Sequence, residues 1–435
     1  MIHMKPIFMG LLWAVILFPK LTHAQGTPEI EKKYTKEIER LVKVKKVQSA
    51  FSLIKEQEDQ TIRDLVTLTE ILAPPFGEDK RGKVFAKMLM EAGVDSIWTD
   101  KVGNVIGLRK GTSGESGFVG VDAHLDVVFP EGTDATVTKV GDTLKAPGIG
   151  DDTRGLTMLI SMLKAMNRAQ IKTQKDLLIV GTVGEEGLGD LRGMKYIFNE
   201  SGLNIHSWIA IDGGSIGRIS NAGLGSKRYK LIISGKGGHS WGDFKLANPH
   251  HALGKAIDVF SKDAWAYTSG DIPKTSFNVG RIGGGTSVNS IPFESWMEVD
   301  MRALDPKNLD EIEAIFKKSV EKAIAEYNAG GVKGEVTYAL EQIGDRPSGE
   351  LPATLPLIQR AMAATQYFGV EPSLGRGSTN INIPVSKGIP SVCIGRGGKG
   401  GGAHSLHEWY LNDETGAESI QLALLITLAQ VGIEK

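Results

Sequence analysis

Cysteine is almost absent from this 435-residue chain, which contains only Cys393. A single cysteine excludes an intrachain disulfide, and the apolar run around Cys393 indicates core packing rather than nucleophilic catalysis. An excess of charge of either sign is also absent, because 50 basic and 51 acidic residues give a net charge of -1 at pH 7. This balance gives no electrostatic basis for binding nucleic acid or an anionic membrane surface.

The chain also lacks an apolar run of the roughly 20 residues that a stable membrane-spanning helix needs. Near the N-terminus, Lys5 precedes a shorter apolar stretch at residues 7–18. The Thr-His-Ala sequence at residues 22–24 fits a signal-peptidase site. We therefore expect residues 1–24 to be a cleaved signal peptide, with an uncleaved anchor as the alternative. The mature protein would be exported to the periplasm or the medium and would have no stable membrane span.

Short apolar runs alternate with helical patterns through much of the chain. The runs that predict buried strands are residues 118–121, 177–183 and 208–211. Between them, residues 154–167 and 191–199 have the apolar spacing of helices. This alternation predicts an α/β fold in which helices cover both faces of a mainly parallel sheet.

The length predicts about two domains. From residue 224 to residue 341 the pattern changes to a compact α+β unit, after which the helix-strand alternation resumes. We expect this unit to be inserted into a catalytic domain made of residues 25–223 and 342–435.

Acidic and imidazole side chains follow several of the predicted strands. They are His124, Asp151, Glu185, Glu186, Asp212 and His404. In an open α/β sheet, ligands bind at the carboxyl ends of the strands, so these side chains can converge on one site. Mixed histidine and carboxylate ligands suit zinc, with manganese or cobalt as possible substitutes in vitro.

Glu185 and Glu186 end a strongly apolar run, where two adjacent acids are costly unless cations neutralise one of them. One glutamate can bind metal while the other handles the proton of a metal-bound water. Asp126 lies two residues after His124 and is a natural partner for its second ring N–H. Viewed alone, either His404 or His407 could be the late ligand.

Taken together, these motifs resemble those of the co-catalytic zinc metallopeptidases that include peptidase T, glutamate carboxypeptidase, aminoacylase and acetylornithine deacetylase. The resemblance begins near Leu65, covers nearly all of the mature chain and is closest to the peptidase T-like and dipeptidase members. The motifs that carry it include HLDVV, GIGDDTRG, GEEG, IDGG, GKGGHS, GGTSVNSIP, VDMRA and GIPSVCIG.

The resemblance implies two zinc ions per chain, bridged by Asp151. His124 and Asp212 would complete one site, and Glu186 and a late histidine the other. The family pattern His-x-x-x-Glu fits His404 followed by Glu408 and favours His404 over His407.

The resemblance also assigns the catalytic roles. It implies that Glu185 is the general base, that Asp126 orients His124, and that the Asp151–Asp152 peptide is cis.

The inserted unit resembles the family's lid and dimerisation domain, which implies a homodimer. His239 matches a lid histidine that reaches the partner's active site and polarises the scissile carbonyl. Asn289 matches a polar residue near the substrate, and Arg346 an arginine that binds a substrate carboxylate in some members. Arg302, in the VDMRA motif, is compatible with a purely structural role.

One departure from the family is visible. Many relatives have Gly-Thr-Asp-Ala-Asn where this chain has Ser-Thr-Asn-Ile-Asn at residues 378–382. The substitution places Asn380 at the Asp position, which we expect to remove a charge beside the substrate pocket.

The main hypothesis is an exported two-zinc exopeptidase for short peptides, in which Glu185 activates a metal-bridging water. The alternative is an N-acyl amino acid deacylase with the same two zinc ions. A third hypothesis, a non-catalytic binding protein, would require loss of ligands that this chain retains. The sequence does not decide between aminopeptidase, carboxypeptidase and dipeptidase.

Overall fold

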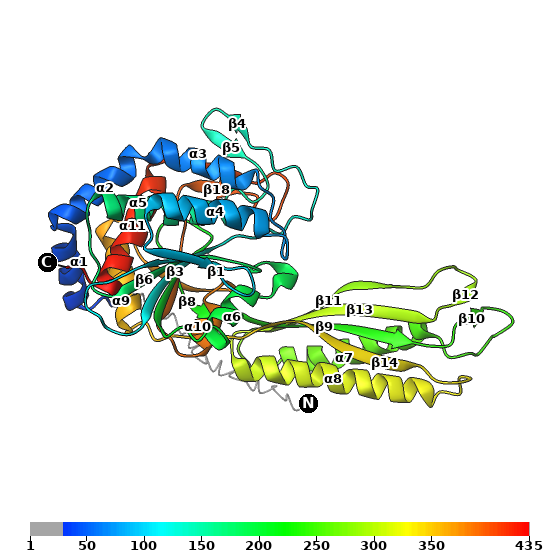
Figure 1. Ribbon diagram of the computed structural model, residues 1–435. Helices are drawn as coiled ribbons and strands as arrows, with labels where there is room; N and C mark the ends of the chain where they lie inside the picture. The colour runs from blue at the N-terminus through cyan, green and yellow to red at the C-terminus, as the bar shows by residue number, and fades with distance from the viewer. Residues whose placement is uncertain (1–28, 435) are drawn as a thin grey trace, which may run out of the picture.

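The computed structural model describes residues 29–434, so the predicted signal peptide lies outside the described residues. Figure 1 shows a rounded unit with a large central sheet and an elongated unit that projects from it. Among the described helices, not one combines the length and apolarity required to cross a membrane.

The central sheet has nine strands in the order β1-β2-β6-β3-β7-β17-β8-β15, with β16 beside β8. They are β1 (Ser96–Thr99), β2 (Val105–Arg109), β3 (Phe118–His124), β6 (Asp176–Thr182), β7 (Ile205–Ile211), β8 (Arg218–Gly223), β15 (Gly349–Glu350), β16 (Ser373–Gly377) and β17 (Ser391–Ile394). The four middle strands, β6-β3-β7-β17, are parallel. They are buried along nearly their whole length, as expected for strands covered on both faces, and the predicted mainly parallel sheet is confirmed.

Helices surround this sheet. They are α1 (Lys32–Val42), α2 (Lys45–Glu56), α3 (Glu58–Thr69), α4 (Asp79–Ala92), α5 (Thr153–Arg168), α6 (Arg192–Asn199), α9 (Pro356–Tyr367), α10 (Asn382–Ser386) and α11 (Glu414–Val431). In Figure 1, α3, α4 and α5 lie above the sheet and α6 and α10 below it. The apolar side chains between the helices and the sheet form one large core.

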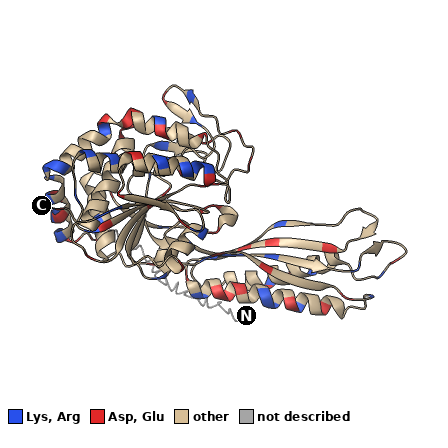
Figure 2. Cartoon of the chain, viewed as in Figure 1, with Lys and Arg blue, Asp and Glu red and all other residues tan. Residues whose placement is uncertain are grey.

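The elongated part, residues 225–346, is called the inserted unit below. Its sheet has the order β11-β13-β9-β14 and is covered on one face by two long helices. These elements are β9 (Gly225–Ser234), α7 (Pro249–Thr268), β11 (Thr275–Gly284), β13 (Glu294–Ala303), α8 (Pro306–Asn328) and β14 (Thr337–Arg346). Acidic and basic residues are interspersed along α8 in Figure 2. The unit has its own core, in which Phe260 packs edge-on against Phe316.

The last strand of the inserted unit is longer than the sequence predicted. β14 pairs with β9 as far as Arg346, opposite Ser226, whereas the predicted boundary followed residue 341. Arg346 therefore belongs to the sheet of the inserted unit.

The chain crosses between the two units twice, at Leu224 and at Pro347. The side-chain amide of Asn382 donates hydrogen bonds to the backbone carbonyls of both residues, at 2.8 Å and 3.0 Å. At the opposite end of the inserted unit, two short strands, β10 (Gly238–His239) and β12 (Ser290–Ile291), form a separate ribbon.

A small antiparallel sheet lies beside the central one, in the order β18-β19-β5-β4. Its strands are β4 (Thr138–Val140), β5 (Thr143–Lys145), β18 (Lys399–Gly401) and β19 (Trp409–Leu411). Leu144 and Tyr410 pack there with Leu65 of α3 in a third apolar cluster. This sheet connects the loop before α5 with the loop that carries His404.

Candidate metal centre

Three neighbouring parallel strands end at the same edge of the central sheet, and a predicted site residue lies at or just after the end of each. His124 is the last residue of β3, opposite Thr182, the last residue of β6. Glu185 and Glu186 follow β6 after a short turn, and Asp212 directly follows β7. The parallel register thus places these acids and the imidazole together at the carboxyl edge of the sheet.

Two further ligand candidates come from loops. Asp151 precedes α5, and its carboxylate oxygens lie 3.2 Å from His124 Nε2 and 3.4 Å from His404 Nε2. His404, between β18 and β19, also lies 3.0 Å from Glu186 Oε1. Asp151 is therefore placed between the two histidines.

Ligand atoms gather in three overlapping groups, within each of which they lie within 4.8 Å of one another. The groups are His124, Glu185 and Glu186; His124, Asp151 and Asp212; and Asp151, Glu186 and His404. The last two groups share only Asp151, whose carboxylate has two oxygens with which to serve two ions.

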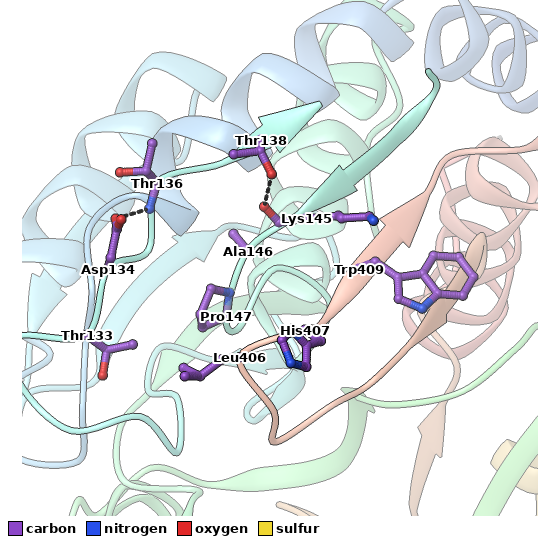
Figure 3. A pocket seen from close by; sticks show the side chains of 10 residues that line it. All are labelled: Thr133, Asp134, Thr136, Thr138, Lys145, Ala146, Pro147, Leu406, His407 and Trp409. Carbon is purple, nitrogen blue, oxygen red and sulfur yellow. Dashed lines mark hydrogen bonds between the residues drawn. The ribbon is translucent and has the colours of Figure 1, made fainter. Parts of the chain in front are cut away.

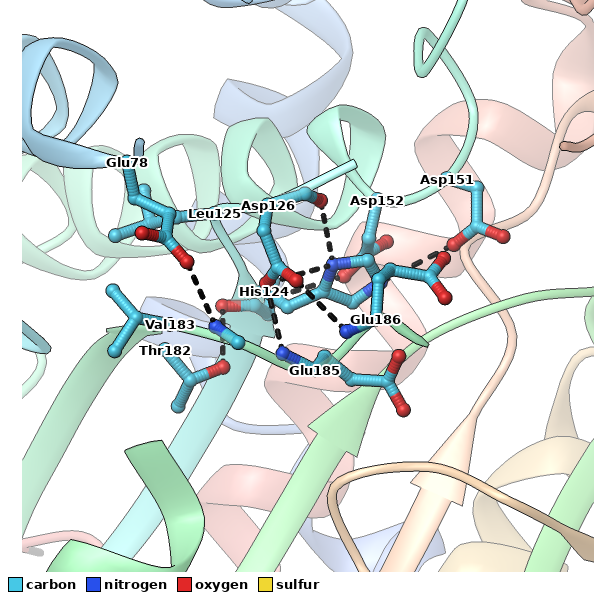
Figure 4. A network of polar contacts seen from close by, with 12 residues as sticks. Glu78, His124, Leu125, Asp126, Asp151, Asp152, Thr182, Val183, Glu185 and Glu186 are labelled. Carbon is cyan, nitrogen blue, oxygen red and sulfur yellow. Dashed lines mark hydrogen bonds and ion pairs between the residues drawn. The ribbon is translucent and has the colours of Figure 1, made fainter. Parts of the chain in front are cut away.

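The carboxylate of Asp126 has a different partner from the expected one. His124 Nδ1 lies 2.9 Å from the backbone carbonyl of Asp126 and 3.7 Å from its carboxylate. The carboxylate instead accepts the backbone N–H groups of Glu185 and Glu186, at 2.9 Å and 2.8 Å, as Figure 4 shows. Asp126 thus fixes the turn that carries both glutamates, and its main chain fixes the histidine ring.

The loop that carries Asp151 is held by Glu408. The buried Glu408 carboxylate accepts the backbone N–H groups of Gly148, Gly150 and Asp151, at 2.7, 2.9 and 2.9 Å. The Asp151–Asp152 peptide is cis, as the resemblance implied. The Asp152 side chain caps α5 by accepting the N–H of Gly155, so this acid has a structural partner.

Glu185 is buried against a guanidinium. Burial raises the pKa of the Glu185 carboxyl, the ion pair with Arg346 at 3.2 Å opposes that rise, and the neighbouring Glu186 adds to it. Arg346 Nη2 also donates to the backbone carbonyl of Glu185. A buried carboxyl with a raised pKa can both accept and return a proton near neutral pH.

The electrostatics of the cluster suit cations. Burial raises the pKa of Asp212, and nearby Asp151 raises it further. Hydrogen bonds to Asp151 and Glu186 raise the pKa of His404 to about 10. The raised pKa values of Asp212 and His404 indicate a surplus of negative charge around them. Divalent cations would neutralise this surplus, so the residues fit a metal centre.

His407 lies apart from this cluster. It lines a cavity of about 550 Å³ with Thr138, Lys145 and Trp409, beside the small antiparallel sheet (Figure 3). Of the two candidate late histidines, His404 is the one whose ring reaches the acids.

His239 and Asn289 are also distant from this chain's own cluster. They lie at the β10-β12 end of the inserted unit, where the backbone N–H of Ser240 donates to the Asn289 carbonyl. His239 is exposed, and its Nδ1 accepts the N–H groups of Trp241 and Gly242.

Asn380, which the sequence placed beside the substrate pocket, is a buried residue. Its side chain is only 3% exposed and donates to the carboxylate of Asp122 and to Thr182 Oγ1. The sequence interpretation treated Asn380 alone, without Asp122. The acid of this buried group is Asp122 in β3, and burial raises the pKa of its carboxyl to about 7. Arg302 pairs with Asp300 on the sheet of the inserted unit, consistent with a structural role.

Sequence analysis missed Arg396. Its buried guanidinium lies 3.9 Å from Asp151 Oδ1, beside Glu408. The available signal was a cation in an otherwise glycine-rich loop directly after the buried strand β17.

The sheet, the inserted unit and the cluster of histidine and carboxylate ligands define a metallopeptidase. The chain belongs to Peptidase family M20/M25/M40, whose model matches residues 120–428. Membership confirms the resemblance and the hydrolase class.

Several proteins are similar to this chain over most of its length. The uncharacterized protein YqjE of Bacillus subtilis (strain 168) is 25% identical over 358 residues, which are 78% of this chain and 91% of that protein. The aminopeptidase PepT from Bacillus cereus is similar in structure, with a TM-score of 0.65, 21% identity, and coverage of 85% of this chain and 98% of that one. The dipeptidase Dug1p from Saccharomyces cerevisiae has a TM-score of 0.69 at 16% identity, with coverage of 89% and 99%. These structural matches support the fold.

Proposed function

We propose that the protein is an exported exopeptidase that hydrolyses short peptides with two zinc ions per chain. The observation that carries this proposal is the pair of ligand groups that share Asp151. His124 and Asp212 would complete one ion site, and Glu186 and His404 the other. The peptidase names of the structural neighbours support peptides as substrates.

Bound zinc would supply Lewis acidity for the scissile carbonyl and would make water a stronger acid. The chain's own contribution is proton transfer. Glu185 would take a proton from the attacking water and return it to the leaving amine as the C–N bond breaks. Asp126 would hold the turn of Glu185, and Glu408 the loop of Asp151, so that neither moves during the reaction.

A second candidate, hydrolysis of N-acyl amino acids, has one specific observation in its favour. A 77-residue stretch, 18% of this chain, is 36% identical to the succinyl-diaminopimelate desuccinylase of Nitrosococcus oceani. That enzyme's name describes removal of an acyl group from an amine, which needs the same attack on an amide carbonyl.

We also propose that the inserted unit forms a homodimer in which His239 and Asn289 complete the partner's site. Two observations support this: both residues lie far from their own cluster, and large apolar side chains are exposed near them. Trp241 is 88% exposed, and Phe244 and Phe293 are 69% and 60% exposed.

The test uses mature protein from Gln25 onward. Zinc per chain is measured, and cleavage of dipeptides, tripeptides and N-acetyl amino acids is followed with and without a chelator. Two zinc ions and chelator-sensitive cleavage of peptides support the exopeptidase, and the released end identifies its subclass. Cleavage of N-acetyl amino acids alone would favour the deacylase, and protein that binds no zinc would refute both.

Glu185→Gln provides the matched variant for the base. It should retain both zinc ions and lose activity by roughly 10²–10⁴-fold, the usual contribution of a general base. Full turnover by this variant would refute the role of Glu185.

A further inference from the structure

Asp122 is a fully buried carboxylate directly beneath the metal centre. It lies in β3, two residues before His124, and has no exposed surface. Both oxygens are occupied. Oδ1 accepts the indole N–H of Trp208 at 2.5 Å, and Oδ2 accepts the hydroxyl of Thr182 at 3.3 Å and the amide of Asn380.

The partners of Asp122 come from the two strands on either side of β3. Thr182 ends β6, three residues before Glu185, and Trp208 is in β7, four residues before Asp212. One carboxylate therefore joins the three strands that deliver the sheet-borne ligand candidates and the proposed base. These hydrogen bonds lie within a few residues of the strand ends. The position of the Asp122 carboxylate therefore affects the lateral spacing of the three strands.

Asn380 joins a fourth segment to this group. Its amide donates to Thr182 Oγ1 at 2.8 Å as well as to Asp122. Two residues earlier, the hydroxyl of Ser378 accepts a hydrogen bond from Arg346, the partner of Glu185. The segment before α10 therefore contacts the strands through Asn380 and, through Ser378, the arginine that pairs with the proposed base.

We propose that Asp122 and Asn380 are a positioning pair that sets the geometry of the metal ligands from beneath, without touching metal or substrate. This inference rests on the proposed function, since it concerns the same centre. The pair needs one acid and one amide. Two carboxylates would repel each other, whereas two amides would leave Trp208 and Thr182 with fewer acceptor lone pairs.

Because the pair needs one acid and one amide, the acid and the amide can exchange positions. With Asn at position 122 and Asp at position 380, the amide oxygen can accept from Trp208 while its NH₂ donates to the new carboxylate. Thr182 can donate to that carboxylate in turn. The exchanged pair retains one carboxyl group, one amide and the same number of partners, so it should restore what each single change removes.

The experiment compares full-length mature wild type with Asp122→Asn, Asn380→Asp and the double exchange. Zinc affinity is measured by competition with a chromophoric chelator, and the unfolding temperature is measured without metal. Each single variant should bind zinc roughly tenfold or more weakly, as when the supports of a metal ligand are removed. The double exchange should return to within about threefold of wild type.

Two further variants separate positioning from general stability. Trp208→Phe keeps an aromatic side chain, smaller than indole, but removes the N–H that donates to Asp122, so it should weaken zinc binding in the same direction. This variant also replaces Asp122→Asn or Asn380→Asp in the comparison if either of them fails to fold. Ser319→Ala removes a buried hydroxyl that bonds Asp263 in the inserted unit, and it should lower the unfolding temperature only.

The proposal is overturned if Asp122→Asn, or Trp208→Phe in its place, lowers the unfolding temperature while zinc affinity stays at the wild-type value. A double exchange that binds zinc no better than the weaker single variant would also overturn it. Failure of the proposed function gives a different result. Wild type would then bind zinc with the expected ranking of variants yet cleave no amide, or would bind no zinc at all.

Discussion

Arg346 holds Glu185 at two points, by donating from Nη1 to the carboxylate at 3.2 Å and from Nη2 to the main-chain carbonyl. Each residue is only 4% exposed. Because Arg346 ends β14, the position of the proposed base depends on the inserted unit. A second contact has the same effect, since Arg228 of β9 donates to the carbonyl of Gly187 at 3.0 Å.

Arg346→Lys keeps the charge but cannot make both contacts. We expect kcat to fall roughly 100-fold, the scale of a misplaced catalytic group. KM should change little. The measurement compares matched peptides with free and amidated C-termini, and the loss should be equal for both. A loss confined to KM for the free carboxylate would show that Arg346 binds the substrate end instead.

Glu408→Gln replaces one acceptor oxygen with an NH₂ group that cannot accept from the backbone near Asp151. Zinc affinity should fall roughly 10- to 100-fold, because the loop of the shared ligand loses its support. Asp413→Ala is the control, since Asp413 caps α11 by accepting the N–H of Thr415 and alanine cannot accept it. It should lower the unfolding temperature and leave zinc affinity unchanged. Equal zinc affinity in the Glu408 variant and wild type would argue against this role.

Co-expression tests whether sites are shared between chains. His239→Ala and Glu185→Gln should each be nearly inactive. In a mixed dimer, the chain with Glu185 intact receives His239 from its partner. Random pairing should therefore restore roughly a quarter of wild-type activity. Preparations that remain inactive despite demonstrated mixed dimers would count against a shared site.

Acid stability should depend on Glu313 of the inserted unit. Burial raises its pKa, but hydrogen bonds from Lys227, Lys317 and Tyr229 lower it more, to about 2. A lowered pKa in the folded state stabilises the protein above the unfolded value of 4.5. That stability is lost as pH falls through about 2. Glu313→Gln should therefore lower the unfolding temperature at pH 7, and the difference should shrink between pH 4.5 and pH 2.

The matched control for that titration is Glu321→Gln, an exposed change on the same helix. It should leave the unfolding temperature unchanged at every pH. A constant difference between the Glu313 variant and wild type from pH 7 to pH 2 would contradict the pKa argument.

Much of the fold was predictable because the central strands are apolar on both faces. The predicted strand at residues 177–183 matches β6 within one residue at each end. β14 was harder to delimit, because six of its ten residues are exposed and its alternation is weak. The strands β4, β5, β18 and β19 each have three residues and were not predicted, since so short a segment carries no usable period.

Individual contacts were less predictable than the set of acids and histidines. The sequence placed Asp126 beside His124, but their spacing could not show that the carboxylate turns to the backbone of Glu185. Asn380 appeared as a lost charge because its partner, Asp122, lies 258 positions away in the chain. Such pairings depend on tertiary packing, which a single sequence does not reveal.

The amide of Asn382 binds both crossings between the units, at Leu224 and Pro347. Rotation about that point can preserve both hydrogen bonds, whereas sliding would break at least one. Asn382 therefore ties both crossings to α10 at one point. Arg346 immediately precedes one crossing and contacts Glu185. A rotation of the inserted unit about Asn382 would therefore move Arg346 and, through it, Glu185. Such a rotation would then determine how closely Arg346 holds Glu185, as well as whether substrate can enter the site.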